Sequence, residues 1–273
     1  MGTEINRRGG DTSLPLWSAR ALLDQPDMVF DIHKDYLSAG AEILTTNTFR
    51  TKDYTFRQAG LIPQGEKLTN LAVKLAMQAV REVNSDALVA GSISPVEDCY
   101  SPVLVPTDEI LIDEHTKMAR WLFEGGVNIL LIETMNLMRE IEIAVNCAKE
   151  FNLPIWLSFT CDEFGNILSG EKIESLIDKF ESKVDALLIN CSNLNASDLA
   201  ISQLRKTKLP FGIYPNFGVI NDTMGWTSKP VTENYMDMVG KWIKTGATIM
   251  GSCCGATPNE TSAVRRIIDS LVN

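Results

Sequence analysis

The sequence predicts an α/β fold, a (β/α)8 TIM barrel whose first strand is missing or truncated at the N-terminus. Short apolar or β-branched runs alternate with longer segments of helical spacing from one end of the chain to the other. This alternation is typical of βα repetition, which builds parallel sheets. The length of 273 residues suits one such barrel, since α/β barrels of about 250 residues form a single unit.

The apolar runs predict seven strands, which cover Glu42–Thr46, Ala87–Gly91, Asn128–Glu133, Ile155–Phe159, Ala186–Asn190, Phe211–Tyr214 and Thr248–Gly251. The segments between them predict helices with one apolar face, because a helix that covers a sheet needs such a face. Amphipathic examples are Asp27–Ala39, Glu140–Glu150 and Asn259–Leu271. Helices and strands therefore alternate along the whole chain.

The first of these helical segments, Asp27–Ala39, has no strand before it. Adding that strand would give eight units of roughly 34 residues, the size of a TIM-barrel repeat. No linker or low-complexity run divides the chain, so we predict one barrel domain over residues 1–273, with Asn216–Thr232 as a long βα loop. A doubly wound open sheet is the alternative, disfavoured because no Gly-rich phosphate turn follows an early strand.

The composition of the chain argues against nucleic-acid and membrane partners. The chain has 25 Lys and Arg against 35 Asp and Glu, a net charge of −10, and no basic run, so we expect no nucleic-acid partner. No apolar run approaches the ~18 residues of a membrane helix and no signal peptide precedes the fold, which predicts a cytoplasmic protein with no membrane partner. In a reducing cytoplasm the six cysteines indicate burial, metal binding or catalysis rather than disulfides.

Three cysteines lie where a barrel builds its active site, at the carboxyl ends of strands. Cys191 ends the sixth strand of a closed barrel, and Cys253 and Cys254 follow the eighth, so their thiols can converge over the mouth. Three thiolates leave the fourth position of tetrahedral zinc open, as in catalytic sites, and sulfur ligands favour zinc over magnesium or calcium. The alternative is that the Cys-Cys pair is simply two small buried residues.

The remaining cysteines and both histidines carry weaker signals. Cys147 lies on the apolar side of a helical segment, which indicates core packing. Cys99 lies in a loop, whereas Cys161 lies just past a strand end and is the better substitute ligand. His33 and His115 lie in helical segments without a second ligand at metal spacing, so we assign them no catalytic role.

Polar residues at other strand ends are candidates for substrate binding. Glu133 ends the apolar run Ile129–Ile132 and is expected to point into the mouth, where a substrate ammonium is one possible partner. A structural Glu that caps the next helix is the alternative. Thr46, Asn47 and Asn216 can orient the polar groups of an amino acid, or can form strand-end hydrogen bonds that stabilise the loops.

The chain resembles the homocysteine S-methyltransferase family over essentially its whole length. The resemblance is carried by Met1-Gly2-Thr3-Glu4-Ile5, Leu16-Trp17-Ser18-Ala19, His33-Lys34-Asp35-Tyr36-Leu37-Ser38-Ala39-Gly40-Ala41, Thr45-Thr46-Asn47-Thr48-Phe49, Ile132-Glu133-Thr134, Ile189-Asn190-Cys191, Tyr214-Pro215-Asn216 and Gly251-Ser252-Cys253-Cys254-Gly255. It implies a TIM barrel with zinc held by Cys191, Cys253 and Cys254. It also implies that Glu133 grips the amino group of homocysteine.

Two departures from the family pattern stand out. Ser252 replaces the second Gly of the family's Gly-Gly-Cys-Cys motif. The family's first strand and its Asp-Gly, which helps to hold the substrate amino group, would lie upstream of Met1. A barrel without that strand has two unpaired edges, so we expect that the start is placed too late in the gene; a seven-stranded or inactive variant is the alternative.

The resemblance implies zinc-dependent transfer of a methyl group from a sulfonium donor to the thiol of homocysteine, giving methionine. The Leu-Trp-Ser-Ala and Tyr-Pro-Asn segments are most similar to stand-alone members that use S-methylmethionine or S-adenosylmethionine without a cobalamin domain. Zinc would bind the sulfur of homocysteine and favour its thiolate form. This is needed because a free thiol with a pKa near 8.5 is mostly protonated at neutral pH. The alternatives are a zinc-dependent lyase or hydrolase and a non-catalytic binding protein.

Overall fold

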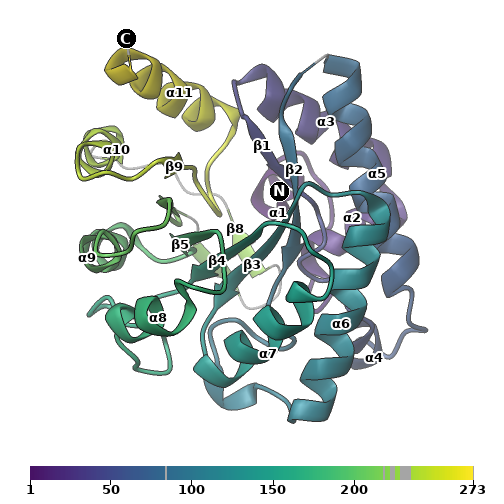
Figure 1. Ribbon diagram of the computed structural model, residues 1–273. Coiled ribbons are helices and arrows are strands. Elements are labelled where there is room, and N and C mark those ends of the chain that lie inside the picture. The colour runs from purple at the N-terminus through teal and green to yellow at the C-terminus, as the bar shows by residue number, and fades with distance from the viewer. Residues whose placement is uncertain (84, 218, 222–224, 228–234, 273) are drawn as a thin grey trace.

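A seven-stranded parallel sheet forms the centre of the computed structural model, which describes residues 1–83, 85–217, 219–221, 225–227 and 235–272. The sheet has the order β1-β2-β3-β4-β5-β6-β9 and curls into a partial barrel (Figure 1). Its strands are β1 (Ile43–Thr45), β2 (Leu88–Ile93), β3 (Ile129–Met135), β4 (Ile155–Phe159), β5 (Ala186–Asn190), β6 (Phe211–Tyr214) and β9 (Ile249–Met250). The seven predicted strands are thus confirmed in order and position: three have the predicted ends, and the ends of the other four differ by one or two residues.

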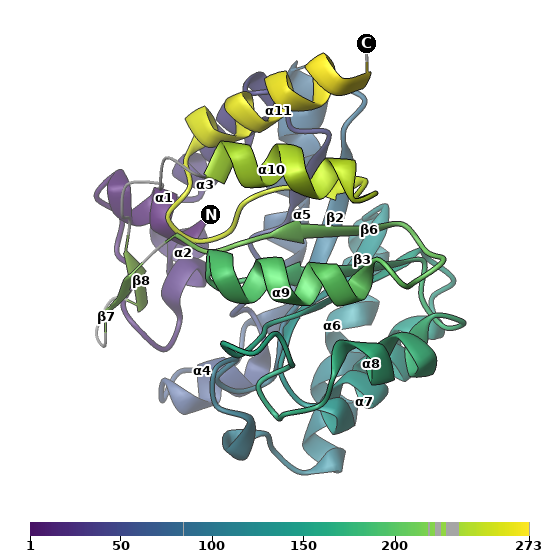
Figure 2. The same cartoon turned by 90° about the vertical axis from the view of Figure 1, so that its left-hand side faces the viewer.

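Helices cover the outer face of this sheet (Figures 1 and 2). The helices that cover it are α3 (Pro26–Ser38), α5 (Gly65–Val83), α6 (Asp108–Gly125), α7 (Met138–Lys149), α8 (Ile173–Phe180), α9 (Leu194–Leu204), α10 (Tyr235–Lys244) and α11 (Pro258–Val272). Shorter helical segments are α1 (Gly2–Arg7), η1 (Trp17–Ala19), α2 (Arg20–Asp24), α4 (Asp53–Gln58) and η2 (Pro102–Leu104). Within the described ranges, no helix combines the length and apolarity needed to cross a membrane.

Alternation along the strands divides the apolar residues into two cores. In β3, Leu130 and Ile132 pack outward with the helices, whereas Ile129 and Leu131 pack inward with Ala186 and neighbouring inner residues. Both faces of the strand are therefore buried, which explains why β3 is apolar without interruption before Glu133. Successive side chains of a strand point to opposite faces, so Glu133 continues the inward series.

The sheet does not close through its strands. β1 and β9 are its two edges, and within the described residues they do not pair with each other. The seam between them is bridged on the outside by α3 and the segment leading into α11. The Tyr36 hydroxyl donates to the Ala256 carbonyl at 3.2 Å, and Arg265 pairs with Glu42 at 2.6 Å. The described residues ahead of β1 contain helical segments and no strand of this sheet, as predicted.

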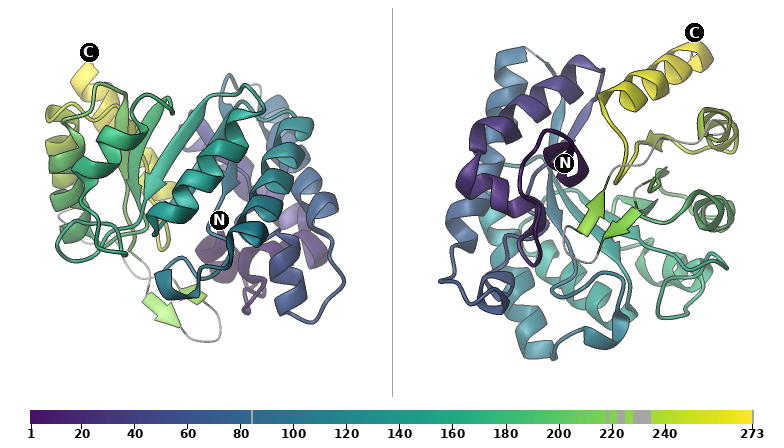
Figure 3. Two further views of the ribbon diagram at one scale, coloured as in Figure 1. Left: turned by 60° about the horizontal axis from the view of Figure 1, so that its bottom comes forward. Right: turned by 180° about the vertical axis from the view of Figure 1, so that it is seen from behind.

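The segment predicted as a long loop, 216–232, contains structure that the sequence did not predict. β7 (Val219–Asn221) and β8 (Gly225–Thr227) form an antiparallel hairpin, and β8 lies against α1 (Figure 3). The segment lies between β6 and α10, where the βα loop was predicted, and the hairpin is an addition to that prediction. Strands of three residues carry too short an alternation to be recognised. Residues 218, 222–224 and 228–232 lie outside the described residues.

Candidate metal centre and substrate pocket

The inner face of the sheet turns from apolar to polar toward the carboxyl ends of the strands. Its polar residues are Ser92 of β2, Glu133 of β3, Ser158 of β4, Asn190 of β5 and Tyr214 of β6, and all but Tyr214 are buried. They form two hydrogen-bonded groups, one around Glu133 and one around Asn190. The inner face at this end of the barrel is therefore polar, and its side chains are held in place by one another.

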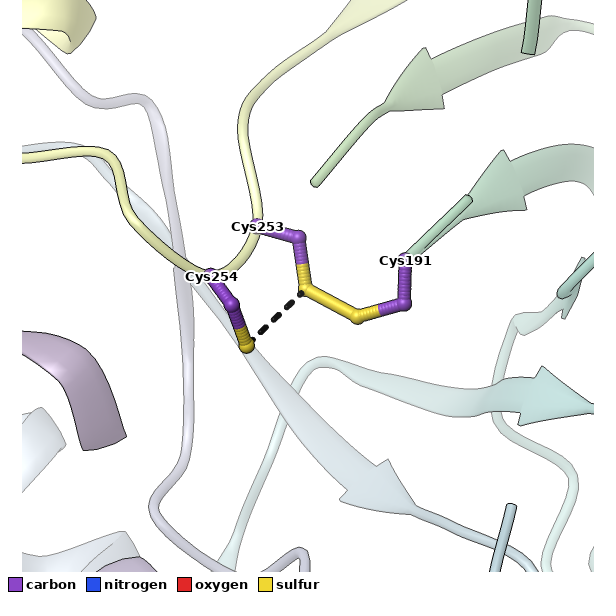
Figure 4. A group of neighbouring side chains, drawn as sticks. All are labelled: Cys191, Cys253 and Cys254. Carbon is purple, nitrogen blue, oxygen red and sulfur yellow. Dashed lines mark hydrogen bonds between the residues drawn. A yellow bond between two sulfur atoms is a disulfide. The ribbon is translucent and has the colours of Figure 1, made fainter. Parts of the chain in front are cut away.

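The three predicted cysteines meet at this end (Figure 4). The sulfur atoms of Cys191, Cys253 and Cys254 lie within 4.8 Å of one another, and the sulfurs of Cys253 and Cys254 are 4.0 Å apart. Cys191 and Cys253 are joined by a disulfide, with their Cα atoms 5.7 Å apart. The expectation that no cysteine forms a disulfide is thus wrong for this pair, because the fold brings two strand ends to bonding distance.

Backbone hydrogen bonds hold the three cysteines together through the segment 214–217. The amide of Cys191 donates to the Tyr214 carbonyl at 3.2 Å, and the amide of Cys253 donates to the Pro215 carbonyl at 2.8 Å. The amide of Phe217 donates to the Cys254 carbonyl at 2.7 Å. The Tyr-Pro-Asn segment is therefore the frame between the two cysteine-bearing strand ends.

Gly255 directly follows the Cys-Cys pair, and its backbone conformation explains why a glycine is found there. Gly255 has a φ of +92°, a region that residues with a Cβ atom rarely adopt, and its amide donates to the Thr3 hydroxyl at 3.0 Å. The chain thereby turns away from the site directly after Cys254. This turn lets two consecutive residues both offer their sulfur atoms to one point.

In its reduced form, this set of three sulfurs could hold a soft divalent metal. In tetrahedral zinc with Zn–S distances of about 2.3 Å, the sulfur atoms lie about 3.8 Å apart, close to the spacing of Cys253 and Cys254. Burial raises the pKa of the Cys254 thiol to about 12, so a cation is needed to stabilise its thiolate at neutral pH. Zinc binding requires Cys191 and Cys253 in their reduced form.

The other cysteines lie apart from this cluster. Among the described residues, neither Cys161 nor Cys99 belongs to the group of sulfurs that could share an ion. Cys161 packs into the core between sheet and helices, and burial raises its pKa to about 12. Cys147 is buried in α7, where it accepts a hydrogen bond from Thr116 at 3.3 Å, which agrees with the prediction of core packing.

The two histidines are buried in helices on the outer face of the sheet. His33 of α3 is buried, and burial lowers its pKa to about 3. His115 of α6 pairs with Glu140 at 3.0 Å, and both side chains are fully buried. Neither histidine belongs to the group of candidate metal ligands found among the described residues.

Glu133 lies inside the barrel mouth, within a strand rather than at a helix start. Ser92 Oγ donates to its Oε1 at 2.5 Å, and the Tyr214 hydroxyl donates to its Oε2 at 3.1 Å. Burial raises the pKa of Glu133, whereas these two hydrogen bonds act in the opposite direction. The next helix, α7, begins at Met138, so Glu133 does not cap it.

The other three predicted substrate residues are held by protein groups to different degrees. Thr46 accepts from the Ser92 amide at 3.1 Å and hydrogen-bonds Thr48 at 2.8 Å, which agrees with a structural role. Asn47 donates to the Ser18 carbonyl at 2.9 Å, while its Oδ1 atom is buried without a partner in the described part of the chain. Asn216 is buried, and its amide donates to the Ser192 carbonyl at 2.9 Å.

Comparison with known proteins agrees with this geometry. The profile of the homocysteine S-methyltransferase family matches residues 1–268. The chain belongs to this family. It is 31% identical to homocysteine S-methyltransferase 2 of Zea mays, over 100% of this chain and 89% of the relative. It is also 30% identical to a selenocysteine methyltransferase of Astragalus bisulcatus, over 99% of this chain and 91% of the relative.

A solved structure of the same family shares the fold. The metallated form of the homocysteine methyltransferase MmuM from Escherichia coli matches with a TM-score of 0.85 and 26% identity, over 97% of this chain and 93% of that chain. The oxidized form of MmuM matches with a TM-score of 0.83 and the same identity and coverage. The fold prediction for this family member is thereby confirmed, and a methyltransferase with this fold exists in a metallated form.

Proposed function

We propose that this protein transfers a methyl group from a sulfonium donor, S-methylmethionine or S-adenosylmethionine, to the thiol of homocysteine and so forms methionine, with zinc as cofactor. The observation that carries the proposal is the convergence of three cysteine sulfurs within 4.8 Å at the carboxyl ends of parallel strands. Family membership supports the methyl transfer. The sulfur-only ligand set supports zinc.

Each residue has a defined part in this proposal. Cys191, Cys253 and Cys254 hold the zinc ion. When bound, the ion supplies a Lewis acid that favours the thiolate form of the acceptor at neutral pH. Glu133 binds the substrate ammonium, because a buried carboxylate gains most from a cationic partner. Ser92 and Tyr214 keep that carboxylate oriented and ionised.

Further contacts to the amino acid are proposed at the rim. The Oδ1 atom of Asn47 is buried and accepts no hydrogen bond from the described residues. The substrate ammonium can donate one to it. Asn216 lies within the segment 214–217 that frames the cysteines. Thr46 precedes Asn47 and, through its hydrogen bond from the Ser92 amide, helps to fix the position of Asn47. Three thiolates with zinc carry a net charge of −1, and the Glu133 carboxylate adds a second negative charge, so the pocket suits a cationic sulfonium donor.

The chemistry of the site also bears on the cellular compartment and on the domain organisation of the protein. Metal binding requires reduced thiols, so we place the protein in the reducing cytoplasm, acting on small molecules. We propose that residues 1–273 work as one barrel domain, since residues from both ends of the chain meet at the site. Thr3, for example, hydrogen-bonds Gly255 beside the cysteine pair.

The test combines metal content with turnover in the reduced protein. Purified protein loaded with zinc is assayed with homocysteine and, in parallel, S-methylmethionine, S-adenosylmethionine, betaine and methyl-folate. We expect one zinc per chain and methionine formation with a sulfonium donor. Cys253→Ser is expected to lose both zinc and turnover, whereas Cys147→Ser, a substitution of a buried cysteine outside the cluster, keeps both. Equal zinc content in the two variants would refute the assignment.

The same assay separates the alternatives. A zinc-dependent hydrolase or lyase needs a base beside a metal-bound water, and the described histidines lie outside the cysteine cluster. A non-catalytic relative would bind homocysteine without forming methionine. Selenocysteine, the substrate named for the Astragalus relative, is included as a second acceptor.

A further inference from the structure

Asn190 makes three buried side-chain hydrogen bonds that the proposed function leaves unexplained. Its Oδ1 accepts from the Thr134 amide at 2.9 Å and from Ser158 Oγ at 2.7 Å. Its Nδ2 donates to Thr134 Oγ1 at 2.7 Å. The side chain of a β5 residue thus reaches across β4 and holds β3, and Asn190 is itself fully buried.

The residue that Asn190 holds is a strained point of β3. The pairing of β3 with β4 shifts between Ile132 and Met135, so β3 carries an extra residue there. Thr134 lies in this bulge with a φ of +61°, a left-handed conformation that a β-branched residue rarely adopts. Such a conformation persists only where the surroundings enforce it. The bonds from Asn190 to both the amide and the hydroxyl of Thr134 provide that enforcement.

Each end of this contact adjoins a residue of the proposed site. Thr134 directly follows Glu133, so the bulge sets where the carboxylate leaves the strand. Asn190 directly precedes Cys191, which also has a left-handed φ of +49°. Cys191 has supports of its own, because its amide donates to the Tyr214 carbonyl at 3.2 Å and its carbonyl accepts from the Tyr100 hydroxyl at 3.2 Å.

We propose that Asn190 is a positioning residue that locks the Thr134 bulge and thereby sets Glu133 at a fixed distance from the cysteine cluster, for the amino group of the acceptor. The inference rests on the proposed function, since it assumes that Glu133 binds that amino group. Asn190 does not contact the substrate. Its removal lets Thr134 relax out of the left-handed region and displaces Glu133, while the supports of Cys191 remain.

The test is the substitution Asn190→Ala in the zinc-loaded, reduced protein. We expect the KM for homocysteine to rise about 30-fold with a smaller change in kcat, because a small displacement of a binding group weakens substrate binding strongly. Zinc content is expected to stay at one per chain. An unchanged KM, or a loss of zinc in proportion to the loss of activity, would overturn the proposal.

Asn193→Ala is the matched control. Asn193 is the N-cap of α9, where its side chain accepts from the Ala196 amide at 3.0 Å, so this substitution removes a structural asparagine three residues away. It is expected to lower the unfolding temperature without changing the KM for homocysteine. A KM rise equal to that of Asn190→Ala would show that loss of stability alone explains the effect.

Two further measurements keep the inference testable. If Asn190→Ala does not fold, Thr134→Val keeps the branched side chain, removes only the bond from Asn190 Nδ2 to Thr134 Oγ1, and is expected to raise the KM about threefold; an unchanged KM would overturn the proposal. A crystal structure of the folded variant is expected to show Thr134 outside the left-handed region. That result is independent of activity, so failure of the inference and failure of the proposed function remain distinguishable.

Discussion

The two sides of the barrel mouth are built in different ways. On the side of β3 to β5, strands of five to seven residues pair in parallel, with one bulge in β3, and most side chains on both of their faces are buried. On the other side, β9 has two residues and β1 has three, and they form the open edges of the sheet. Glu133 and Cys191 belong to the first side, whereas Cys253 and Cys254 follow β9.

This difference indicates where the site is rigid and where it depends on loops. The first side gains its order from the sheet and from inward hydrogen bonds such as that between Asn190 and Thr134. The second side depends on backbone hydrogen bonds to the segment 214–217 and on contacts across the seam. Glu133 and the cysteine pair should therefore respond to different substitutions.

The largest effect is expected where β9 is attached to the sheet. A Cβ atom added to Gly212 of β6 would lie 2.0 Å from the Ile249 carbonyl oxygen, so Gly212→Ala must push β9 away. We expect the free energy of unfolding to fall by about 3 kcal/mol, measured in urea, and zinc content to fall with it. Gly240→Ala in α10 is the control, because a Cβ there meets open space, and it should raise stability by up to about 1 kcal/mol. Equal losses in both variants would contradict the special closeness of β6 and β9.

On the rigid side, Glu133→Gln should separate substrate binding from metal binding. The loss of one partner of a buried charge pair is expected to raise the KM for homocysteine about 100-fold, while zinc content stays unchanged. Metal analysis and steady-state kinetics check both results. A parallel loss of zinc would mean that the two sides of the mouth are not independent.

The pH dependence of homocysteine binding follows from the same carboxylate. Burial raises the pKa of Glu133, and only the ionised form attracts an ammonium, so the KM should rise as the pH falls through this raised pKa. Tyr214→Phe removes a hydrogen bond that favours the ionised form, which should move this rise to higher pH. The profile of KM against pH for both proteins is the measurement. Identical profiles would show that Tyr214 does not act on Glu133.

The raised pKa of Glu133 also affects protein stability. Homocysteine binding is expected to improve as the pH rises, whereas the contribution of Glu133 to stability is expected to fall. A carboxyl group whose pKa is higher in the folded than in the unfolded state makes folding less favourable as the pH rises through the folded pKa. Without ligands, Glu133→Gln is therefore expected to be at least as stable as the wild type at neutral pH. Urea unfolding at acidic and neutral pH tests this sign.

The smallest effect is expected at the outer seam. Tyr36→Phe removes the hydroxyl that bonds the Ala256 carbonyl and so weakens the link between α3 and the segment before α11. We expect the unfolding free energy to fall by about 1 kcal/mol, with zinc content and KM unchanged. A loss of zinc in this variant would show that the seam, and not only the segment 214–217, holds the cysteine pair.

The sequence by itself determined the order of strands and helices, the parallel sheet and the convergence of Cys191, Cys253 and Cys254 at one end of it. These features depend on local periodicity and on the rule that parallel strands end at the same edge, both of which can be read without knowing contacts. Glu133 was found by the same rule. The inward series of Ser92, Asn190 and Tyr214 could have been found by counting alternate residues along each predicted strand.

Only the tertiary structure decided how these residues are held. The bulge at Thr134, the reach of Asn190 across β4, the disulfide between Cys191 and Cys253 and the hairpin of β7 and β8 arise from contacts between distant segments. A one-residue shift in strand pairing or a left-handed φ leaves no periodic trace in the chain. Such features are set by the closeness of backbones in space, which propensity and spacing do not encode.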